Sequence, residues 1–552
     1  MKNWFKTGDP WIWMIGGGLA ISLIMVVGLL SLIAVRGFGH FWPSPIMATT
    51  ATVEGREVPV LGVMSRSETL PAQRVREAGE VVEEGQLLVT RHLIKVGNRD
   101  IDSRDFVWYR ESALGPLSYP DDAVMIERRE WGNFYGYAEA LAREGEVVAT
   151  EDALWPALQQ AIDRANELHD RIRSLEKVEI GSINSRMEKV RLERRGLELR
   201  GVSDAELSAA LADLDARQAE LELEFSQIQA QRKQLLEQSR RDVLVARTAS
   251  GQQVRLPLSQ LVMASKNNEM NLAGKLGFYA HQIKEFLTGF PREANTEGGI
   301  FPAIFGTVTM VLIMSVMVTP FGVLAAIYLR EYARQGAILK IIRISVYNLA
   351  GVPSIVFGVF GLGFFVYLLG GSIDEMFYPE RLPAPTFGTP GLFWASLTLA
   401  LLTLPVVIVS TEEGLARIPR TIREGSLALG ATKWETLWKV VVPLSAPAMM
   451  TGLILAVARA AGEVAPLMLV GVVKLAPSLP IDGEFPYVHL ERKIMHLGFH
   501  IYDVGFQSPN VEAARPLVYA TALTLVVLIL VLNLSAIAIR NRLREKYRAE
   551  GD

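Results

Sequence analysis

Six long apolar runs constrain this 552-residue chain more than any other feature. Each run reaches the length of about 18 or more residues that a helix needs to cross the hydrocarbon core of a bilayer. We therefore predict six transmembrane helices, and we exclude a single soluble globular domain. The predicted spans cover residues 11–35, 302–329, 344–369, 392–410, 447–472 and 516–539.

Basic residues beside the spans predict how the chain is oriented. Lys2 and Lys6 precede the first run, which is too long for a cleaved signal peptide, and five basic residues lie between 540 and 548 after the last run. The positive-inside rule then places both termini in the cytoplasm of a bacterium, with the protein in the inner membrane. Residues 37–298, between the first and second spans, are expected to be periplasmic.

Charge is divided unequally along the chain. Residues 37–298 contain 33 Lys+Arg and 41 Asp+Glu, a net charge of -8, whereas the other 290 residues carry a net charge of +5. This division fits an acidic exported domain on a membrane body with a basic inner face, although so long a block would cross the membrane whatever its charge. The overall charge of -3 shows no basic excess, so we expect no nucleic-acid partner.

The insert at 37–298 divides into three segments by composition. Residues 47–130 contain short β-rich runs, residues 151–243 resemble long helices, and residues 244–292 return to β character before an amphipathic helix. The helical segment carries a heptad seam, which predicts a coiled-coil α-hairpin of about 60 Å with a turn at Gly201 and Ser203. The alternative is a solvated charged helix without a partner. The seam residues are Leu158, Ile162, Ala165, Leu168, Ile172 and Leu175, then Leu207, Leu211, Leu214, Leu221, Phe225, Ile228 and Leu235.

Motifs for catalysis are missing from the sequence. It has no G-x-x-x-x-G-K-[ST] phosphate loop, no G-x-S-x-G elbow and no H-E-x-x-H helix, and cysteine is absent. We therefore expect no catalytic residue, no cofactor and no nucleotide site, so that energy from ATP must come from another subunit. His496 and His500, with Asp503 nearby, could bind a metal on a helix, but no second motif supports this, and we predict surface histidines in an outer loop and no metal.

Residues 423–443, hereafter the EAA-like segment, resemble the EAA loop of ABC-transporter permeases. Glu424, Gly430 and Pro443 fall on the fixed positions of that pattern, whereas Gly425 and Ser426 depart from its two alanines. The segment predicts two short helices that break at Gly430 and present an apolar face to a groove on an ATPase. The alternative is an amphipathic helix anchored at the membrane interface by tryptophans. The predicted coupling residues are Glu424, Gly430, Ala431, Trp434, Leu437, Trp438 and Pro443.

Four further motifs, at 299–307, 322–329, 351–358 and 459–466, are similar to the phosphate ABC transporter permease family PstA. The similarity covers roughly residues 295–540 and, by position, the first span. It implies an all-α polytopic membrane protein with the type I ABC importer permease fold. It also implies phosphate transport across the inner membrane, with three kinds of partner: a second permease (PstC-like), an ATPase dimer (PstB-like) and a periplasmic phosphate-binding protein (PstS-like).

The domain boundaries expected from this resemblance follow the spans. Residues 1–36 hold the N-terminal tail and first span, 37–298 the insert, 299–540 the permease domain and 541–552 a cytoplasmic tail. The insert is far longer than the outer loop typical of the family.

Polar residues inside the predicted spans are candidates for the substrate pathway. Arg459 and Glu463 are four residues apart and are predicted to lie mid-span on one helical face, where unpaired charges would be costly. Their alternative role is an ion pair that locks spans together. Ser410, Thr411 and Glu412 end the fourth span, and Val409 stands where relatives carry an arginine.

Two alternative functions remain open from the sequence. The chain could import another oxyanion, such as molybdate, sulfate or phosphonate, because the EAA-like segment names only the superfamily, although the motifs at 299–307 and 459–466 favour phosphate. It could instead be an envelope adaptor or scaffold, because an anchor, a β domain and an α-hairpin also occur together in that class. An adaptor, however, needs neither five more spans nor an EAA-like segment.

Overall fold

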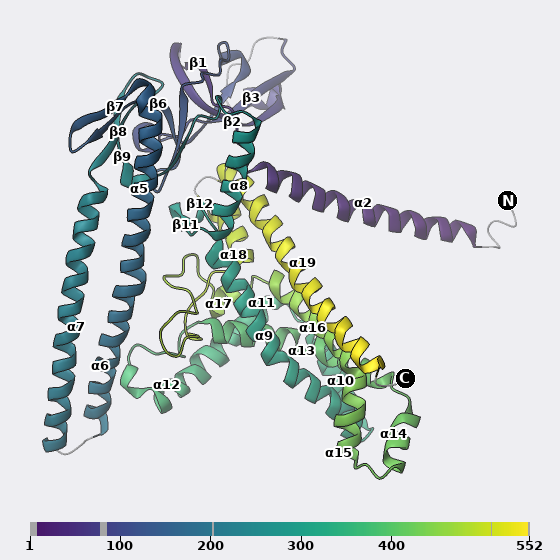
Figure 1. Ribbon diagram of the computed structural model, residues 1–552. Helices are drawn as coiled ribbons and strands as arrows, with labels where there is room; N and C mark the ends of the chain where they lie inside the picture. Colours follow the sequence, from purple (N-terminus) through teal and green to yellow (C-terminus); the bar gives the residue numbers. More distant parts are fainter. Residues whose placement is uncertain (1–7, 54, 78–84, 201–203, 509–510, 550–552) are drawn as a thin grey trace. The chain divides into compact units, whose positions relative to one another are not determined.

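The computed structural model describes residues 8–53, 55–77, 85–200, 204–508 and 511–549 (Figure 1). The chain divides into two compact units. The membrane unit comprises Met1–His40, Leu287–Pro291 and Ile300–Asp552, and the insert unit comprises Phe41–Phe286 and Arg292–Gly299. Each unit has its own hydrophobic core.

Among the described residues of the membrane unit, six helices are long and apolar enough to cross a bilayer. The predicted polytopic helical membrane protein is therefore confirmed. The spans are formed by α2 (Asp9–Gly39), α9 (Phe301–Ile327) with η6 (Tyr328–Tyr332), α11 (Ser354–Phe360) with η7 (Gly361–Gly370) and α12 (Gly371–Phe377), α13 (Leu392–Ala416), α15 (Lys433–Glu435) with η9 (Thr436–Val441) and α16 (Val442–Gly462), and α19 (Val511–Ala549). Shorter helices connect them: α10 (Ala337–Leu349), α14 (Arg420–Ala428), α17 (Leu467–Val470) and α18 (Leu497–Tyr502).

Two of the predicted spans have the wrong boundaries. The third span begins at Ser354 rather than at 344, because Pro353 precedes a new helix and the preceding turns form the separate amphipathic helix α10. The fifth span covers Lys433–Gly462 rather than 447–472, because the second half of the EAA-like segment continues into α16 without a break. Apolar runs thus located the spans, but local helix breaks determined where they end.

The core of the membrane unit lies where α13 packs against α9 and α16. Glycines allow the close approach that membrane helices use in place of a hydrophobic driving force. At Gly452 of α16, an added Cβ would lie 2.6 Å from the Cβ of Ser410 on α13, and at Gly322 of α9 it would lie 2.6 Å from Cγ1 of Val407. The helices α9, α13 and α16 are therefore in direct backbone proximity.

The first span contacts this body at one end only. Gly37, near the C-terminal end of α2, packs against Leu523 of α19 and is the buried residue of the helix. The rest of α2 is exposed within this subunit, which suits a helix surrounded by lipid or by another membrane subunit.

The insert unit contains two antiparallel sheets of four and six strands, besides the two-stranded pair of β11 (Pro291–Arg292) and β12 (Glu297–Gly298). One has the order β1-β2-β3-β4, and the other has the order β10-β5-β6-β8-β9 with β7 paired to β6. The strands of the first sheet are β1 (Met47–Val53), β2 (Arg56–Pro71), β3 (Leu88–Lys95) and β4 (Phe106–Arg110). The strands of the second are β5 (Ala123–Arg128), β6 (Phe134–Arg143), β7 (Glu146–Thr150), β8 (Asp242–Arg247), β9 (Gln253–Pro257) and β10 (Leu261–Ser265). The short helices α3 (Ala72–Glu77) and α4 (Arg99–Asp102) and the longer α8 (Leu272–Thr288) complete the unit.

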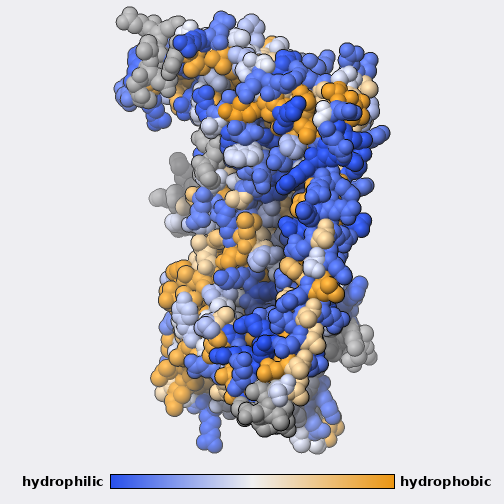
Figure 2. All heavy atoms as spheres, turned by 90° about the vertical axis from the view of Figure 1, so that its left-hand side faces the viewer, coloured by the Kyte–Doolittle hydropathy of each residue, from blue (hydrophilic) through white to orange (hydrophobic). Residues whose placement is uncertain are grey.

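A long helical arm leaves the second sheet and returns to it. It runs through α5 (Leu154–Ser174), η3 (Leu175–Glu179) and α6 (Ile180–Arg200) and comes back through α7 (Asp204–Ser239), beside α6 (Figure 1). The predicted turn at 201–203 lies outside the described residues. Figure 2, which is viewed from the left-hand side of Figure 1, shows mostly hydrophilic side chains on that face.

The heptad seam serves two different contacts along this arm. Ile183 and Val190 of α6 form a buried cluster with Leu214 and Leu221 of α7. At the upstream end of the seam, Leu158, Ile162 and Ala165 join the core against the second sheet, while α5 and η3 also contact α7. Ion pairs flank the α6–α7 contact, for example Arg186–Glu224 at 2.7 Å, as at the edge positions of coiled coils.

The insert unit ends in a strained turn. Glu293, Ala294 and Asn295 have φ values of 45°, 53° and 77°, a left-handed conformation that L residues adopt only at a cost. Ion pairs hold the start of this turn to the insert, because Arg99 bonds Glu293 at 2.6 Å and Arg292 pairs with Glu127.

We expect Gly452→Leu to loosen the contact between α13 and α16, because the new side chain has no space beside Ser410. Overpacking of this kind costs about 1–3 kcal/mol. Gly363→Leu is the matched control, since an added Cβ there meets nothing within 4 Å. Thermal unfolding of the detergent-purified protein should shift downward for Gly452→Leu alone, and equal melting temperatures for the two variants would contradict the packing assignment.

Candidate functional site

The EAA-like segment is built from two helices with a sharp turn between them. The first, α14, ends at Ala428, and Gly430 follows with a φ of 89°, which favours glycine because it has no Cβ. Thr432 and Glu435 then form a capping box that starts α15. The chain thus reverses at Gly430 through a left-handed glycine, and the Thr432–Glu435 capping box stabilises the start of the next helix.

Apolar side chains on the segment face solvent. Leu429 is 91% exposed and Trp434 60%, and the rings of Trp434 and Trp438 lie 5.3 Å apart between centroids. Large apolar side chains exposed together on a soluble face are typical of a surface that another protein covers. Leu437 does not belong to this face, contrary to the sequence prediction, because it is buried against Ile327 and neighbouring residues in the body of the unit.

The other predicted coupling residues occupy different environments. Glu424 is exposed on α14, Ala431 is half-buried after the turn, and Pro443 lies in the first turn of α16. Because η9 continues into α16 without a break, Pro443 lies inside the continuous helix Lys433–Gly462. The exposed face therefore consists of Leu429, Trp434 and Trp438, with Glu424 available beside them.

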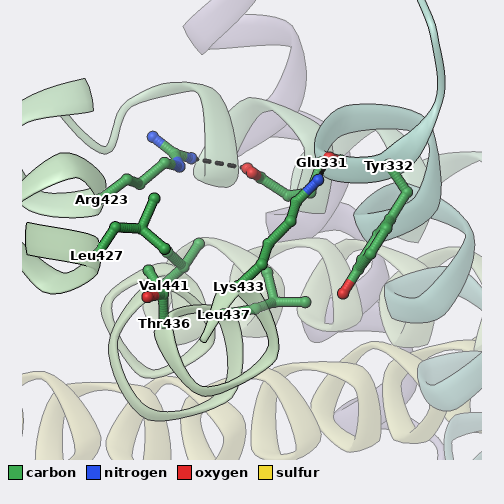
Figure 3. Close-up of a pocket in the computed structure, with 8 residues that line it drawn as sticks. All are labelled: Glu331, Tyr332, Arg423, Leu427, Lys433, Thr436, Leu437 and Val441. Carbon is green, nitrogen blue, oxygen red and sulfur yellow. Dashed lines mark hydrogen bonds and ion pairs between the residues drawn. The ribbon is translucent and has the colours of Figure 1, made fainter. Parts of the chain in front are cut away.

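Charged residues that the sequence analysis missed fasten the segment to the end of α9 (Figure 3). Arg423 of α14 bonds the carboxylate of Glu331 at 2.8 Å, and Lys433 donates to the backbone oxygen of the same residue at 2.8 Å. The Lys433 ammonium also lies 4.5 Å from the ring centroid of Tyr332, a cation–π contact. The sequence signal was the charged run that follows an apolar span, at residues 330–331.

These contacts surround a cavity of about 140 Å³. It lies between the end of α9 and the two halves of the EAA-like segment, and its polar lining comes from the charged residues in Figure 3. The full lining is Glu331, Tyr332, Arg423, Leu427, Lys433, Thr436, Leu437 and Val441.

The predicted pathway pair lies at the opposite end of α16. Arg459 Nε and Glu463 Oε1 are 3.5 Å apart, so the two side chains do meet. The prediction of a mid-span helical face is wrong, however, because Arg459 lies in the last turn of α16 and Glu463 is its extended C-cap residue. Both side chains are partly accessible, at 35% and 21%. The two charged side chains therefore lie at a helix end where solvent can reach them.

The residues at the end of α13 form a second group. Ser410 packs against Gly452, the buried Thr411 hydroxyl bonds no described residue, and Glu412 pairs with Arg343 of α10 at 2.5 Å. Since Gly452 precedes Arg459 by seven residues, the two groups are separated by roughly 10 Å along α16. The structure thus brings the predicted pathway residues together in two groups rather than one.

The two clustered histidines are not surface residues, contrary to prediction. His496 and His500 are 1% and 2% exposed. His496 is the N-cap of α18 and His500 lies within this helix, which packs into the membrane unit. Burial lowers the pKa of both imidazoles to about 4, so both are neutral at neutral pH. Asp503 is equally buried and pairs with Lys474 at 3.2 Å. Among the described residues, no group of three or more His, Cys, Asp or Glu side chains could hold a metal ion.

Known proteins share the membrane half of this chain. Residues 318–548 match the family described as "Binding-protein-dependent transport system inner membrane component". "Phosphate transport system permease protein PstA 1" of Mycobacterium tuberculosis is 32% identical over 266 residues, which cover 48% of this chain and 76% of the relative. "Phosphate transport system permease protein PstA" of Mycobacterium leprae is 34% identical over 269 residues, which cover 48% and 79%. An inward-facing MetNI methionine ABC transporter structure aligns at a TM-score of 0.33, with 17% identity over 44% of this chain and 94% of that chain.

We expect Gly430→Ala to destabilise the turn of the EAA-like segment, because an alanine in the left-handed region costs roughly 1–2 kcal/mol. Gly425→Ala is the matched control: Gly425 is helical, neither glycine has an atom within 4 Å of an added Cβ, and alanine should favour that helix. Amide hydrogen exchange over residues 420–441 should accelerate in Gly430→Ala only. Equal exchange in both variants would show that the turn does not depend on glycine.

Proposed function

Because this chain belongs to the binding-protein-dependent transport system inner membrane component family, we propose that it is the permease subunit of an ABC importer for inorganic phosphate. The observation that carries the proposal is its similarity to PstA permeases over three quarters of their length. The chain supplies half of a membrane pathway and hydrolyses nothing itself. Its membrane partner in this proposal is a second, PstC-like permease.

The EAA-like segment is the proposed docking surface for a PstB-like ATPase dimer. The exposed Trp434 and Trp438 would enter an apolar groove, and the reversal at Gly430 sets the angle between the two helices. A helix inserted in this way couples two proteins because its apolar face loses contact with water only in the complex. The sequence has no phosphate-binding loop of its own, which is consistent with a separate ATPase.

The Arg459–Glu463 pair is the proposed charged element of the phosphate pathway. A guanidinium can bond a phosphate with two parallel hydrogen bonds, and Glu463 orients Arg459 when phosphate is absent. The partial exposure of both side chains lets an anion reach them. Ser410, Thr411 and Glu412 are proposed to line the other end of the pathway, where hydroxyl groups can donate to the anion. Delivery of phosphate is assigned to a periplasmic PstS-like binding protein.

The insert is proposed to lie in the periplasm, with both termini of the chain in the cytoplasm. The supporting observations are the net charge of -8 on residues 37–298 and the basic residues that flank the first and last spans. The β sheets and the arm formed by α6 and α7 would then lie on the periplasmic side, where they could contact the binding protein or another envelope component. The arm carries its own apolar seam and ion pairs.

We expect Arg459→Gln to reduce phosphate uptake at least about tenfold, since a hydrogen bond to a charged group contributes about 1.5–3 kcal/mol. The ATPase should still co-purify, because the EAA-like segment lies at the other end of α16. Arg334→Gln removes the same charge from an exposed site and should transport normally. Uptake of radiolabelled phosphate into cells, with sulfate and molybdate as competitors, measures transport by both variants. Normal uptake by Arg459→Gln would show that this residue does not belong to the pathway.

The proposed topology predicts which residues a membrane-impermeant maleimide can reach. The chain has no cysteine, so Leu199→Cys in the arm and Leu429→Cys in the EAA-like segment each introduce a single target at an exposed position. In spheroplasts the first variant should be labelled at once, and the second only after permeabilisation. The reverse pattern would invert the orientation of the protein.

A further inference from the structure

We infer that Arg423, Glu331 and Lys433 form a bracket that transmits movement of the EAA-like segment to α9. The inference rests on the proposed function, since it assigns how a docked ATPase would act on the spans. The three residues are not among the predicted coupling residues and do not belong to the exposed face. They connect the segment inward, to the membrane unit itself.

The guanidinium of Arg423 joins three elements. Its Nη2 donates to Glu331 Oε1 at 2.8 Å and to the Leu415 carbonyl at 2.8 Å, and its Nη1 donates to the Ile418 carbonyl at 2.7 Å. These acceptors lie on η6 and at the C-terminal end of α13. The Arg423 and Glu331 side chains are only 19% and 14% exposed, so solvent weakens their attraction less than at an open surface. Arg423 is therefore held at the point where α14, α13 and the end of α9 meet.

Lys433 provides a second link from the other half of the segment. It follows the turn at Gly430, yet it donates to the backbone oxygen of Glu331, the residue that Arg423 binds through its carboxylate. In Figure 3 the two cations approach Glu331 from different ribbons. Both helices of the EAA-like segment are thus fastened to one residue of η6, so a rotation of the segment about Gly430 must displace that residue.

Apolar packing joins the segment to α9 only in part. Leu437 is buried against Ile327 at the end of α9, whereas a cavity of about 140 Å³ lies beside Leu427 and the charged residues. Dense packing is what makes protein interiors transmit displacement, and the cavity interrupts it at this point. The polar links border this cavity. Beyond them, α9 packs against α13 through Gly322 and Val407, which gives the displacement a route to the spans.

Distance measurements between spin labels test the bracket directly. Because the chain lacks cysteine, Gln335→Cys and Ala428→Cys place one label after α9 and one on α14. In the full complex with its ATPase, the distance distribution should broaden in Arg423→Gln and in Glu331→Gln. The double variant should be no broader than either single one, as expected for partners in one link. Arg417→Gln, an exposed arginine six residues away, is the control and should match the unmodified background.

Transport measurements test whether the bracket matters for coupling. In proteoliposomes containing the complete complex, Arg423→Gln and Glu331→Gln should lower the phosphate transported per ATP hydrolysed by at least about fivefold, the lower bound of typical coupling between linked sites. ATPase binding and hydrolysis should persist. An unchanged ratio, an unchanged distance distribution or loss of ATPase binding would each overturn the bracket. If the unmodified complex moves no phosphate, the proposed function fails, and the spin-label distances alone decide the inference.

Discussion

A bilayer interior offers no water to a backbone, and this constraint shapes the membrane unit. Every span must satisfy its own peptide groups as a helix, and association between helices must come from close contact instead of from burial of apolar surface. The glycines at the α9, α13 and α16 contacts meet that requirement, because each lets a neighbouring side chain approach the backbone. The polar residues of the candidate pathway then lie at the ends of these tightly packed helices.

The sequence predicted the spans well because length and apolarity suffice for that purpose. It predicted their ends poorly, because Pro353 and the unbroken passage from the EAA-like segment into α16 act within one or two turns. The turn at Gly430 could be predicted, because it depends on a single residue and its neighbours. The burial of Leu437 could not be predicted in this way, because its environment is formed by Ile327 and Leu415 from other helices.

The candidate site shows the same division between local and distant information. The spacing of Arg459 and Glu463 indicated a pair, but the helix end at Gly462 decided its geometry. The Arg423–Glu331 contact joins residues 92 positions apart, so no pattern within one segment could reveal it. The burial of His496 and His500 likewise depends on helices distant in sequence, and the four-residue spacing of the two histidines does not indicate it. The roles of these residues in transport and coupling stay predictions.

The exposure of α2 has a consequence for how freely this gene can vary. None of the most apolar window of α2 is buried within the subunit, whereas 67% of the corresponding window of α13 is buried. Within this chain, selection on α2 therefore acts on length and mean hydropathy and at Gly37, whereas selection on α13 acts on the shape of individual side chains. Substitutions among Leu, Ile, Val and Met should accumulate quickly in α2 and slowly in α13. Related sequences would then diverge faster in α2 than in α13, although the hydropathy of α2 is the easier of the two to recognise.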